Sequence, residues 1–346
     1  MLTKTFFPRL KKLIISCLAL TLCLSAYAQA PLAKQSALDY LTPQEGASLT
    51  LELDLTELIN NKNTKTYFPG ALTAPDGKML KVEVRPRGKF RRRICEVPPL
   101  KLKFPKKELR AAQLDTFNEI KLVVPCFDDP RGEELLLREY VAYRMFERLN
   151  PQYSVRARLV KITFRDRHVE QFKSPVYCIL LEHEEQLAAR LGGQIAAAYS
   201  LTPDSLHTEQ AAQTAMFQYL IGNTDWGIHD ARNVHMFRPA NGDKIRLIPY
   251  DFDFAGLVNA PYASPNAESG LKNVRERHLM ADGIPPSALR QSAQIIKNAW
   301  PDLLAICNAP VFSKNTAKSL VQYLETYLGS IENNPALQER AKGNLR

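Results

Sequence analysis

The chain has 346 residues, of which 45% are hydrophobic and 24% are charged, and its formal net charge at pH 7 is +10. This composition is that of an ordinary globular protein and excludes a disordered or low-complexity chain. The sequence has no internal repeat of fixed period, and its length allows one large domain or two closely packed ones.

The first 30 residues have the design of a secretory signal peptide. Basic residues come first, a mainly apolar run follows over 13–24, and A-x-A patterns lie at 26–28 and 28–30. The run is short for a bilayer span, so an N-terminal membrane anchor is the alternative interpretation. Cleavage would take four basic residues from the 46 and none from the 36 acidic ones, which leaves a net charge of +6. No later segment approaches a membrane span, so we expect an exported protein, periplasmic or extracellular, with no transmembrane segment after cleavage.

A β-rich region is predicted over 48–204, after a loosely attached leader over 31–47. Its strands follow from alternating or apolar segments, and its one helix from apolar side chains at helical spacing before Asn150-Pro151. The predicted helix covers 133–150, and the predicted strands cover 49–55, 79–93, 98–104, 118–126, 155–164 and 174–183.

The remaining region, 205–346, is predicted to be mostly helical. Its helices cover 208–222, 289–300, 301–308 and 315–331, and a short strand pair separates two Asp-rich segments. A β-rich N-terminal lobe followed by a mostly helical C-terminal lobe makes a bilobal α+β architecture. The cleft between such lobes is the natural place for a ligand.

Four cysteines remain after the predicted cleavage. We predict that Cys95 pairs with Cys126, because export permits disulfides and each residue lies at the edge of a predicted strand. Such a bridge stabilises the fold by about 3–4 kcal/mol through the entropy of the closed loop. Cys178 and Cys307 lie in apolar segments, where two buried thiols and a second bridge are equally consistent with the sequence. No cysteine–histidine spacing indicates zinc.

The two Asp-rich segments are GNTDWGIHDARN at 222–233 and PYDFDF at 249–254, and each follows an apolar segment. The first presents Asp225, Asp230 and Asn233 in a loop after a helix. In the second, a period of two would place Asp251 and Asp253 on one strand face, where they repel each other unless a cation or a proton lies between them. Because Mg²⁺ prefers carboxylates and phosphate oxygens, the combination predicts a metal and phosphate site. The alternative is that these aspartates pair with nearby arginines or cap a turn.

A row of cations precedes these segments. In KVEVRPRGKFRRR, five basic residues at alternate positions would share one strand face: Arg85, Arg87, Lys89, Arg91 and Arg93. Gly88 allows a ligand to approach the backbone closely. The row is either a phosphate platform or a solvated rim, and export together with few interleaved aromatic residues argues against a nucleic-acid partner. In the next strand, Lys101 and Lys103 share one face, and a strand lysine can pair with a helix glutamate and reach the phosphates of a nucleotide. Glu139 is the first candidate partner and Glu134 the second.

In chain order these features are a glycine-containing strand turn, a strand lysine, a helix glutamate, an Asp…Asn loop and an Asp after an apolar strand. The segments VRPRGKFRR…PPLKLKF, YLIGNTDW…RN and PYDFDFAGLVNAPYA resemble the CotH-like family, the atypical kinases first associated with spore coats. The resemblance covers roughly residues 80–265, and GNxDW and YDFDF are its most specific parts. It implies a kinase-like bilobal fold that uses ATP and Mg²⁺.

The same resemblance implies roles for individual residues. Asp225 would be the catalytic aspartate, Lys103 would hold the nucleotide phosphates, and the metal ligands would be Asn233, Asp251 and Asp253. Arg87 and Arg91, beside Gly88, would replace the backbone amides of a glycine-rich loop. Asp225 lies eight residues before Asn233 and Asp230 lies three before it, whereas the loop H-R-D-x-x-x-x-N of kinases has a separation of five. The choice of base therefore stays open between these two aspartates.

The sequence thus predicts an exported phosphotransferase that moves a phosphoryl group from ATP to a hydroxyl of a protein or small molecule, with Mg²⁺. Two alternatives stay open. A non-catalytic kinase-like envelope protein would bind an acidic ligand and would keep this binding without Asp225 and Asp251. A metal-dependent phosphoester hydrolase would turn over without any nucleotide.

Overall fold

The computed structural model describes residues 34–166, 175–196, 203–335 and 337–338. The predicted signal peptide over 1–30 lies outside these residues. From Ser36 onward, the described residues form one compact unit, which mixes helices and strands.

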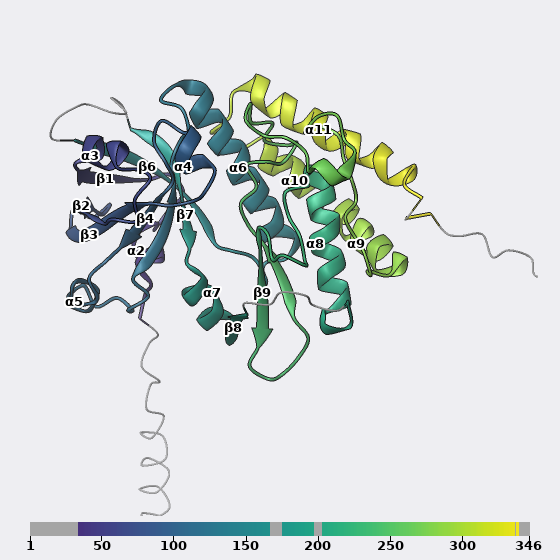
Figure 1. Ribbon diagram of the computed structural model, residues 1–346, viewed down its shortest axis with the longest axis horizontal. Coiled ribbons are helices and arrows are strands. Elements are labelled where there is room, and N and C mark those ends of the chain that lie inside the picture. The colour runs from purple at the N-terminus through teal and green to yellow at the C-terminus, as the bar shows by residue number, and fades with distance from the viewer. Residues whose placement is uncertain (1–33, 167–174, 197–202, 336, 339–346) are drawn as a thin grey trace, which may run out of the picture. The chain divides into compact units, whose positions relative to one another are not determined.

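The first half of this unit is a closed barrel of seven strands, in the order β1-β2-β3-β4-β5-β7-β6 (Figure 1). Neighbouring strands are antiparallel except β1 and β6, which pair in parallel and close the barrel. Alternate side chains point inward and form a core of Leu, Val, Ile and Phe. The strands are Ala47–Leu53 (β1), Phe68–Thr73 (β2), Met79–Pro86 (β3), Leu100–Lys103 (β4), Glu119–Val123 (β5), Ala157–Arg165 (β6) and Val176–Glu182 (β7).

Six α-helices lie in the described part of this half, and α6 is the longest of them. Asp129 caps α6 by accepting a hydrogen bond from the N–H of Gly132, and Pro130 occupies its first turn, as helix N-termini favour. One face of α6 packs toward the second half of the unit (Figure 1). The helices are Ala37–Leu41 (α2), Leu55–Asn60 (α3), Arg91–Ile94 (α4), Lys106–Ala111 (α5), Pro130–Leu149 (α6) and Glu184–Leu191 (α7).

The predicted leader over 31–47 is not loosely attached throughout. Within it, Ala37, Leu38 and Leu41 are buried in the barrel core, and β1 begins at Ala47. Ser36 caps α2 by accepting from the N–H of Asp39. A five-residue helix shows little periodicity, which explains why its apolar side chains were not recognised as part of the core.

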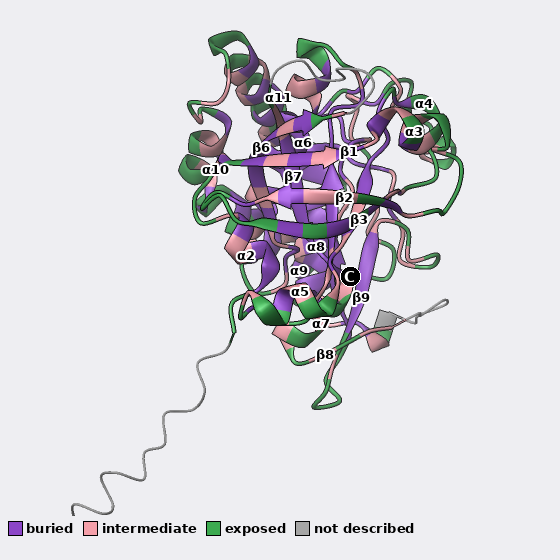
Figure 2. Ribbon diagram, turned by 90° about the vertical axis from the view of Figure 1, so that its left-hand side faces the viewer, coloured by how far each residue is buried: buried purple, intermediate pink, exposed green. Residues whose placement is uncertain are grey.

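Where it is described, the second half contains four α-helices and a three-stranded sheet in the order β10-β9-β8. The predicted helix after residue 208 and the predicted strand pair are confirmed, and Gly222, in the left-handed conformation, ends α8. Figure 2 shows buried residues in both the barrel strands and the helices, and they form two core clusters, one inside the barrel and one around α6 and the second half. The elements are Gly193–Ala196 (β8), Thr208–Ile221 (α8), Val234–Pro239 (β9), Arg246–Pro249 (β10), Pro286–Asn298 (α9), Trp300–Cys307 (α10) and Lys314–Glu332 (α11).

The predicted strand over 79–93 is wrong beyond residue 86. β3 ends at Pro86, Gly88 has a φ of 82°, and residues 91–94 form the single turn of α4. Proline removes a ladder donor, and the left-handed glycine turns the chain away from the sheet. The five cations at alternate positions therefore do not share one strand face.

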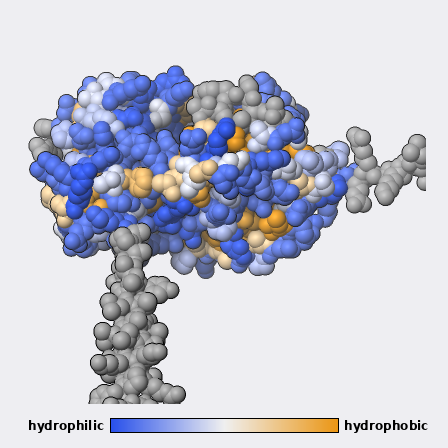
Figure 3. Space-filling view, turned by 90° about the horizontal axis from the view of Figure 1, so that it is seen from below, coloured by the Kyte–Doolittle hydropathy of each residue, from blue (hydrophilic) through white to orange (hydrophobic). Residues whose placement is uncertain are grey.

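The predicted Cys95–Cys126 disulfide is confirmed, and it joins the end of α4 to the segment between β5 and α6. Cys178 and Cys307 are buried free thiols, which decides between the two interpretations of this pair. The face shown in Figure 3 is mostly hydrophilic, with small separate apolar patches. No helix in the described ranges is long and apolar enough to cross a membrane.

Candidate functional site

Asp251 lies at the centre of the candidate site. It follows β10 by one residue, adopts a φ of 63°, and its backbone N–H donates to the Tyr143 hydroxyl at 2.9 Å. An aspartate in the left-handed region is uncommon and costs conformational energy, which is a frequent property of functional positions. The predicted strand face shared by Asp251 and Asp253 is wrong, because β10 ends at Pro249 and Asp251 turns the chain.

The loop after α8 brings Asp225 and Asn233 together across their eight-residue separation. The Asn233 side-chain amide donates to the Asp225 backbone carbonyl at 2.6 Å and to its carboxylate Oδ2 at 2.9 Å. Trp226, only 2% exposed, packs the loop against the interior. The unusual spacing therefore still yields a direct Asp–Asn contact, in which the amide orients the carboxylate.

The pKa of the Asp225 carboxyl is raised above its ordinary value. Burial is the main cause, and the charges of Asp251 and Asp230 add to it, while Arg232 and the Asn233 hydrogen bond oppose it. Arg232 Nη1 lies 3.6 Å from Asp225 Oδ1, and its Nε lies 3.0 Å from Asp230 Oδ2. A raised pKa favours a role of the Asp225 carboxylate as a proton acceptor, because proton transfer from a hydroxyl is then less uphill. Asp230 is also half exposed, with 53% of its side-chain surface accessible.

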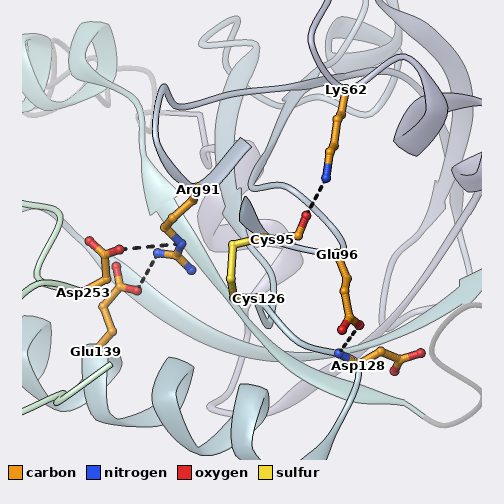
Figure 4. The surroundings of a disulfide bond; sticks show 8 residues. All are labelled: Lys62, Arg91, Cys95, Glu96, Cys126, Asp128, Glu139 and Asp253. Atoms are coloured by element: carbon orange, nitrogen blue, oxygen red, sulfur yellow. Dashed lines mark hydrogen bonds and ion pairs between the residues drawn. A yellow bond between two sulfur atoms is a disulfide. The ribbon is translucent and has the colours of Figure 1, made fainter. Parts of the chain in front are cut away.

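A buried ionic cluster joins α4, α6 and the segment after β10 (Figure 4). The Arg91 guanidinium donates to Glu139 Oε2 at 2.9 Å, and its Nε lies 3.8 Å from Asp253 Oδ2. All three side chains are less than 10% exposed. Burial raises the pKa of both the Glu139 and Asp253 carboxyls, and the Arg91 charge opposes this shift. Arg91 is therefore an internal counterion, and not the open phosphate ligand that the sequence predicts.

Lys103 does not meet Glu139. It lies at the end of β4 opposite Glu119, and its Nζ stands 5.2 Å from the centroid of the Tyr67 ring. The helix that carries Glu139 follows the other end of β5, which explains why Lys103 is out of place for this pair. The second candidate partner, Glu134, instead pairs with Arg138 at 2.8 Å.

Lys121, in β5, is the lysine that sequence reasoning missed. It is 9% exposed, its Nζ lies 2.7 Å from Glu184 Oε2, and it lies over the Tyr250 ring. Burial lowers the pKa of its ammonium, as does the charge of Arg87, while Glu184 and Asp251 oppose the shift. The sequence does hold a signal for it, because Lys121 is the one charged residue within the apolar run IKLVV that leads to the helix of Glu139. A strand lysine directly before a helix glutamate is the kinase order.

Arg87 is the basic residue of the predicted row whose charge acts on this lysine. Burial is the largest cause of the lowered pKa of Lys121, and the charge of Arg87 is the second. Arg87 forms no ion pair with any residue in the described part of the chain. Gly88 follows it with a positive φ and with open space where a Cβ would lie. Arg87 and Gly88 therefore remain candidates for phosphate binding, whereas Arg91 is occupied.

The residues that converge here fit a divalent cation. Burial is the main cause of each pKa shift at Glu139, Asp225 and Asp253, and the charge of Asp251 raises all three further, so these four carboxylates interact electrostatically. Within the described ranges, Glu139 Oε1 and Asp253 Oδ2 are buried without a hydrogen-bond partner. No cluster of three or more His, Cys, Asp or Glu side chains in the same ranges is arranged to hold a metal by itself. Mg²⁺, which commonly uses one or two carboxylates and completes its shell with phosphate and water, matches such an incomplete set.

A pocket of about 370 Å³ adjoins the loop of Asp225. Trp226 and Ile228 contribute apolar surface to it, and Asp230 and Arg232 contribute charge. Asp225 does not line the pocket itself, but Arg232, which does, lies 3.6 Å from the Asp225 carboxylate.

His235, in β9, makes the fold sensitive to acid. It stacks on Tyr250 with 4.2 Å between ring centroids, and burial, together with the Lys121 charge, lowers its pKa to about 3. An unfolded histidine takes up its proton near pH 6.5, whereas this one stays neutral, so stability falls as the pH drops from about 6.5 toward 3.

We expect this histidine alone to lower the free energy of unfolding by about 2 kcal/mol between pH 7.5 and pH 5. His235→Phe keeps a ring on Tyr250 and should lack that part of the loss. Urea unfolding of both proteins at the two pH values measures the difference. An equal loss of unfolding free energy in the wild type and in His235→Phe would show that His235 does not cause this acid sensitivity.

No family model matches the chain, and no curated protein matches it. Among solved structures, the chain is similar to the Helicobacter pylori proinflammatory kinase CtkA, with 11% identity, a TM-score of 0.37, and coverage of 66% of this chain and 90% of that chain. It is also similar to the Rio2 kinase–ADP/Mg²⁺–phosphoaspartate complex from Chaetomium thermophilum, with 13% identity, a TM-score of 0.25, and coverage of 80% of this chain and 75% of that chain. Both are kinases, but likeness at these TM-scores is too low to assign a fold or a function. The proposal that follows therefore depends on the residues of this chain.

Proposed function

We propose that this protein is an exported phosphotransferase of the kinase type, which moves a phosphoryl group from ATP to a hydroxyl group. The observation that carries the proposal is the position of Asp251. Its charge acts on the pKa of Lys121, Glu139, Asp225 and Asp253, which come from β5, α6, the loop after α8 and the segment after β10. A strand lysine, a helix glutamate, an Asp–Asn loop and an Asp after a strand are the parts that phosphoryl transfer requires.

The nucleotide phosphates would be held by Lys121 and Arg87, beside Gly88. Lys121 is paired with Glu184, so we expect phosphate oxygens to replace or join this carboxylate as its partner. Glu139 does not hold the lysine in this scheme. It is held itself by Arg91, and the pair fixes α6 against the segment that contains Asp253.

Asp251 and Asn233 would be the principal ligands of Mg²⁺, because Asp253 is engaged by Arg91. The ion, when bound, supplies positive charge to the phosphate oxygens. Asp225 would accept the proton of the attacking hydroxyl, since it is oriented by the Asn233 amide and its pKa is raised by burial. The bilobal division of the chain near residue 204 belongs to the same proposal.

The test is turnover of ATP by the mature protein, residues 31–346, followed as ADP release and as phosphate incorporation by mass spectrometry. We expect Mg²⁺-dependent ADP release in the wild type and a loss of at least tenfold in Lys121→Met. Lys101→Met is the matched control, because Lys101 lies opposite Lys121 on the neighbouring strand but is paired with Glu119 at 2.6 Å.

Each other outcome has a defined meaning. Equal losses in Lys121→Met and Lys101→Met would contradict the role of Lys121. Nucleotide binding without turnover would indicate the non-catalytic interpretation. Hydrolysis of a phosphoester substrate such as p-nitrophenyl phosphate, without nucleotide, would indicate the hydrolase.

A further inference from the structure

The turn of α4 has few anchors of its own. Among residues 90–95, only Arg91 and Cys95 are buried, at 8% and 1% exposure, while Phe90 and Ile94 remain 38% and 40% exposed. Phe90 has ring contacts with Phe254 and Tyr262. A four-residue helix is too short to be stable alone, so the conformation of this turn depends on what ties it down.

The two buried residues tie the turn to the same neighbouring segment at different points. The Cys95 N–H donates to the Arg91 carbonyl at 2.9 Å, so the disulfide and the guanidinium lie on one helical turn. The partner Cys126 precedes α6 by four residues, and α6 carries Glu139, which pairs with Arg91. Figure 4 shows the disulfide and the ionic cluster next to each other.

Other contacts at this junction are few and partly exposed. The Glu96 N–H donates to the Cys126 carbonyl at 3.0 Å, and the exposed Asp128 N–H donates to Glu96 Oε2 at 2.9 Å. The Lys62 ammonium donates to the Cys95 carbonyl at 2.8 Å. The disulfide is thus the one covalent link between the turn of Arg91 and the strand–helix connection that leads to Glu139.

We propose that the Cys95–Cys126 disulfide is a positioning element of the site, which holds Arg91 between Glu139 and Asp253. Without it, the turn of α4 keeps the Phe90 ring contacts and the Arg91 ion pairs but loses its covalent link, and we expect it to shift so that two buried carboxylates lose their counterion. The negative charges of Glu139 and Asp253 then repel each other and the charge of Asp251, and this repulsion disturbs the residues proposed to hold the metal and the phosphates. Phosphoryl transfer is therefore expected only from the oxidised protein.

The redox step balances with a dithiol as reductant. Thiol–disulfide exchange transfers two electrons and two protons to the cysteine pair, which becomes two thiols, while the dithiol becomes a disulfide. Because the cytosol keeps thiols reduced and exported compartments do not, this device would keep the enzyme inactive before export. This consequence for activity depends on the proposed function, whereas the movement of Arg91 does not.

The first test is independent of nucleotide and uses arginine labelling by phenylglyoxal, read by peptide mass spectrometry, before and after treatment with dithiothreitol. We expect Arg91 to be protected in the oxidised protein and to become at least fivefold more reactive after reduction. Arg138, buried to the same extent but paired within α6, should stay protected, and exposed Arg93 should react in both states. Unchanged protection of Arg91 in a reduced protein would overturn the proposal.

The second test separates positioning from simple stabilisation by a double-mutant cycle. The double substitution Cys95→Ser, Cys126→Ser should lower ATP turnover at least tenfold in the wild-type background, but should cause no further loss in the Arg91→Lys background. The melting temperature should fall in both backgrounds, because the loop entropy of the disulfide does not depend on Arg91. An equal fold-loss of turnover in both backgrounds would overturn the proposal. If the oxidised wild type shows no turnover at all, the proposed function fails, and the labelling result alone decides this inference.

Discussion

Replacing Asp225 with Asn is expected to lower ATP turnover by about 10²–10⁴-fold, the usual contribution of a general base. The amide keeps the shape of the carboxylate but cannot accept the proton of the attacking hydroxyl. The affinity for Mg·ATP should change much less, because Asp251 and Lys121 remain in place. Steady-state turnover and calorimetric binding, measured on the same protein, separate the two effects.

Asp230→Asn is the matched control, because it changes the same charge in the same loop. Asp230 is half exposed and pairs with Arg232, so its loss should alter turnover less than about threefold, as for a surface ion pair. A large loss in Asp230→Asn with little loss in Asp225→Asn would show that the base is Asp230. The same pair of variants thus decides the alternative that the loop spacing leaves open.

The pH profile should follow the same residue. Because burial raises the pKa of Asp225, activity should be lost as the pH falls through a value above the ordinary 3.8. Arg232 opposes that shift, so Arg232→Met should move the acidic limb of the profile to higher pH. A limb that does not move would show that a different group controls it.

The second large effect is expected from Arg91→Met, which should lower the free energy of unfolding by about 3–5 kcal/mol. The variant leaves Glu139 and Asp253 buried without their counterion, and that desolvation is the physical reason for the loss. Replacing Glu139 by Leu in addition removes one of these charges, so the double variant should regain part of the stability but not the activity. Chemical unfolding of the single and double variants measures both changes.

Arg148→Met serves as the control for this comparison. Arg148 makes an ion pair with Asp302 at 2.5 Å, but half of its side chain is exposed, so its loss should cost at most about 1 kcal/mol. If Arg91→Met and Arg148→Met lowered the free energy of unfolding by the same small amount, Arg91, Glu139 and Asp253 would not form a buried ionic cluster in solution.

Sequence patterns predicted those features that depend on regular local structure. The helix α8 with its glycine stop and the strands β6 and β7 follow from hydrophobic periodicity, and they appear within a few residues of their predicted bounds. The Asp225–Asn233 contact was also foreseeable, because both residues lie in one short loop after that helix. The disulfide followed from the positions of two cysteines at strand edges.

The features that were missed depend on breaks in regularity or on distant contacts. Basic residues at alternate positions over 85–93 have the spacing of one strand face, but β3 ends at Pro86, Gly88 turns the chain, and Arg91 is buried. Its partner Glu139 lies 48 residues further along the chain, a pairing that no local pattern encodes. Lys121 was not recognised as a candidate site residue, because a single lysine in an apolar strand does not indicate a function until its neighbours in the fold are known.

The assignment of Asp251 as the centre of one metal and phosphate site is tested most directly by calorimetric titration of the mature protein with ATP, with and without Mg²⁺. The same titration is made with the Asp251→Asn variant and with a control variant, Asp243→Asn. The control changes an exposed aspartate that pairs with Arg246. We predict binding that requires Mg²⁺, is retained in Asp243→Asn and is lost in Asp251→Asn. A folded wild type that binds no Mg·ATP, or an Asp251→Asn variant that binds it equally well, would contradict this account.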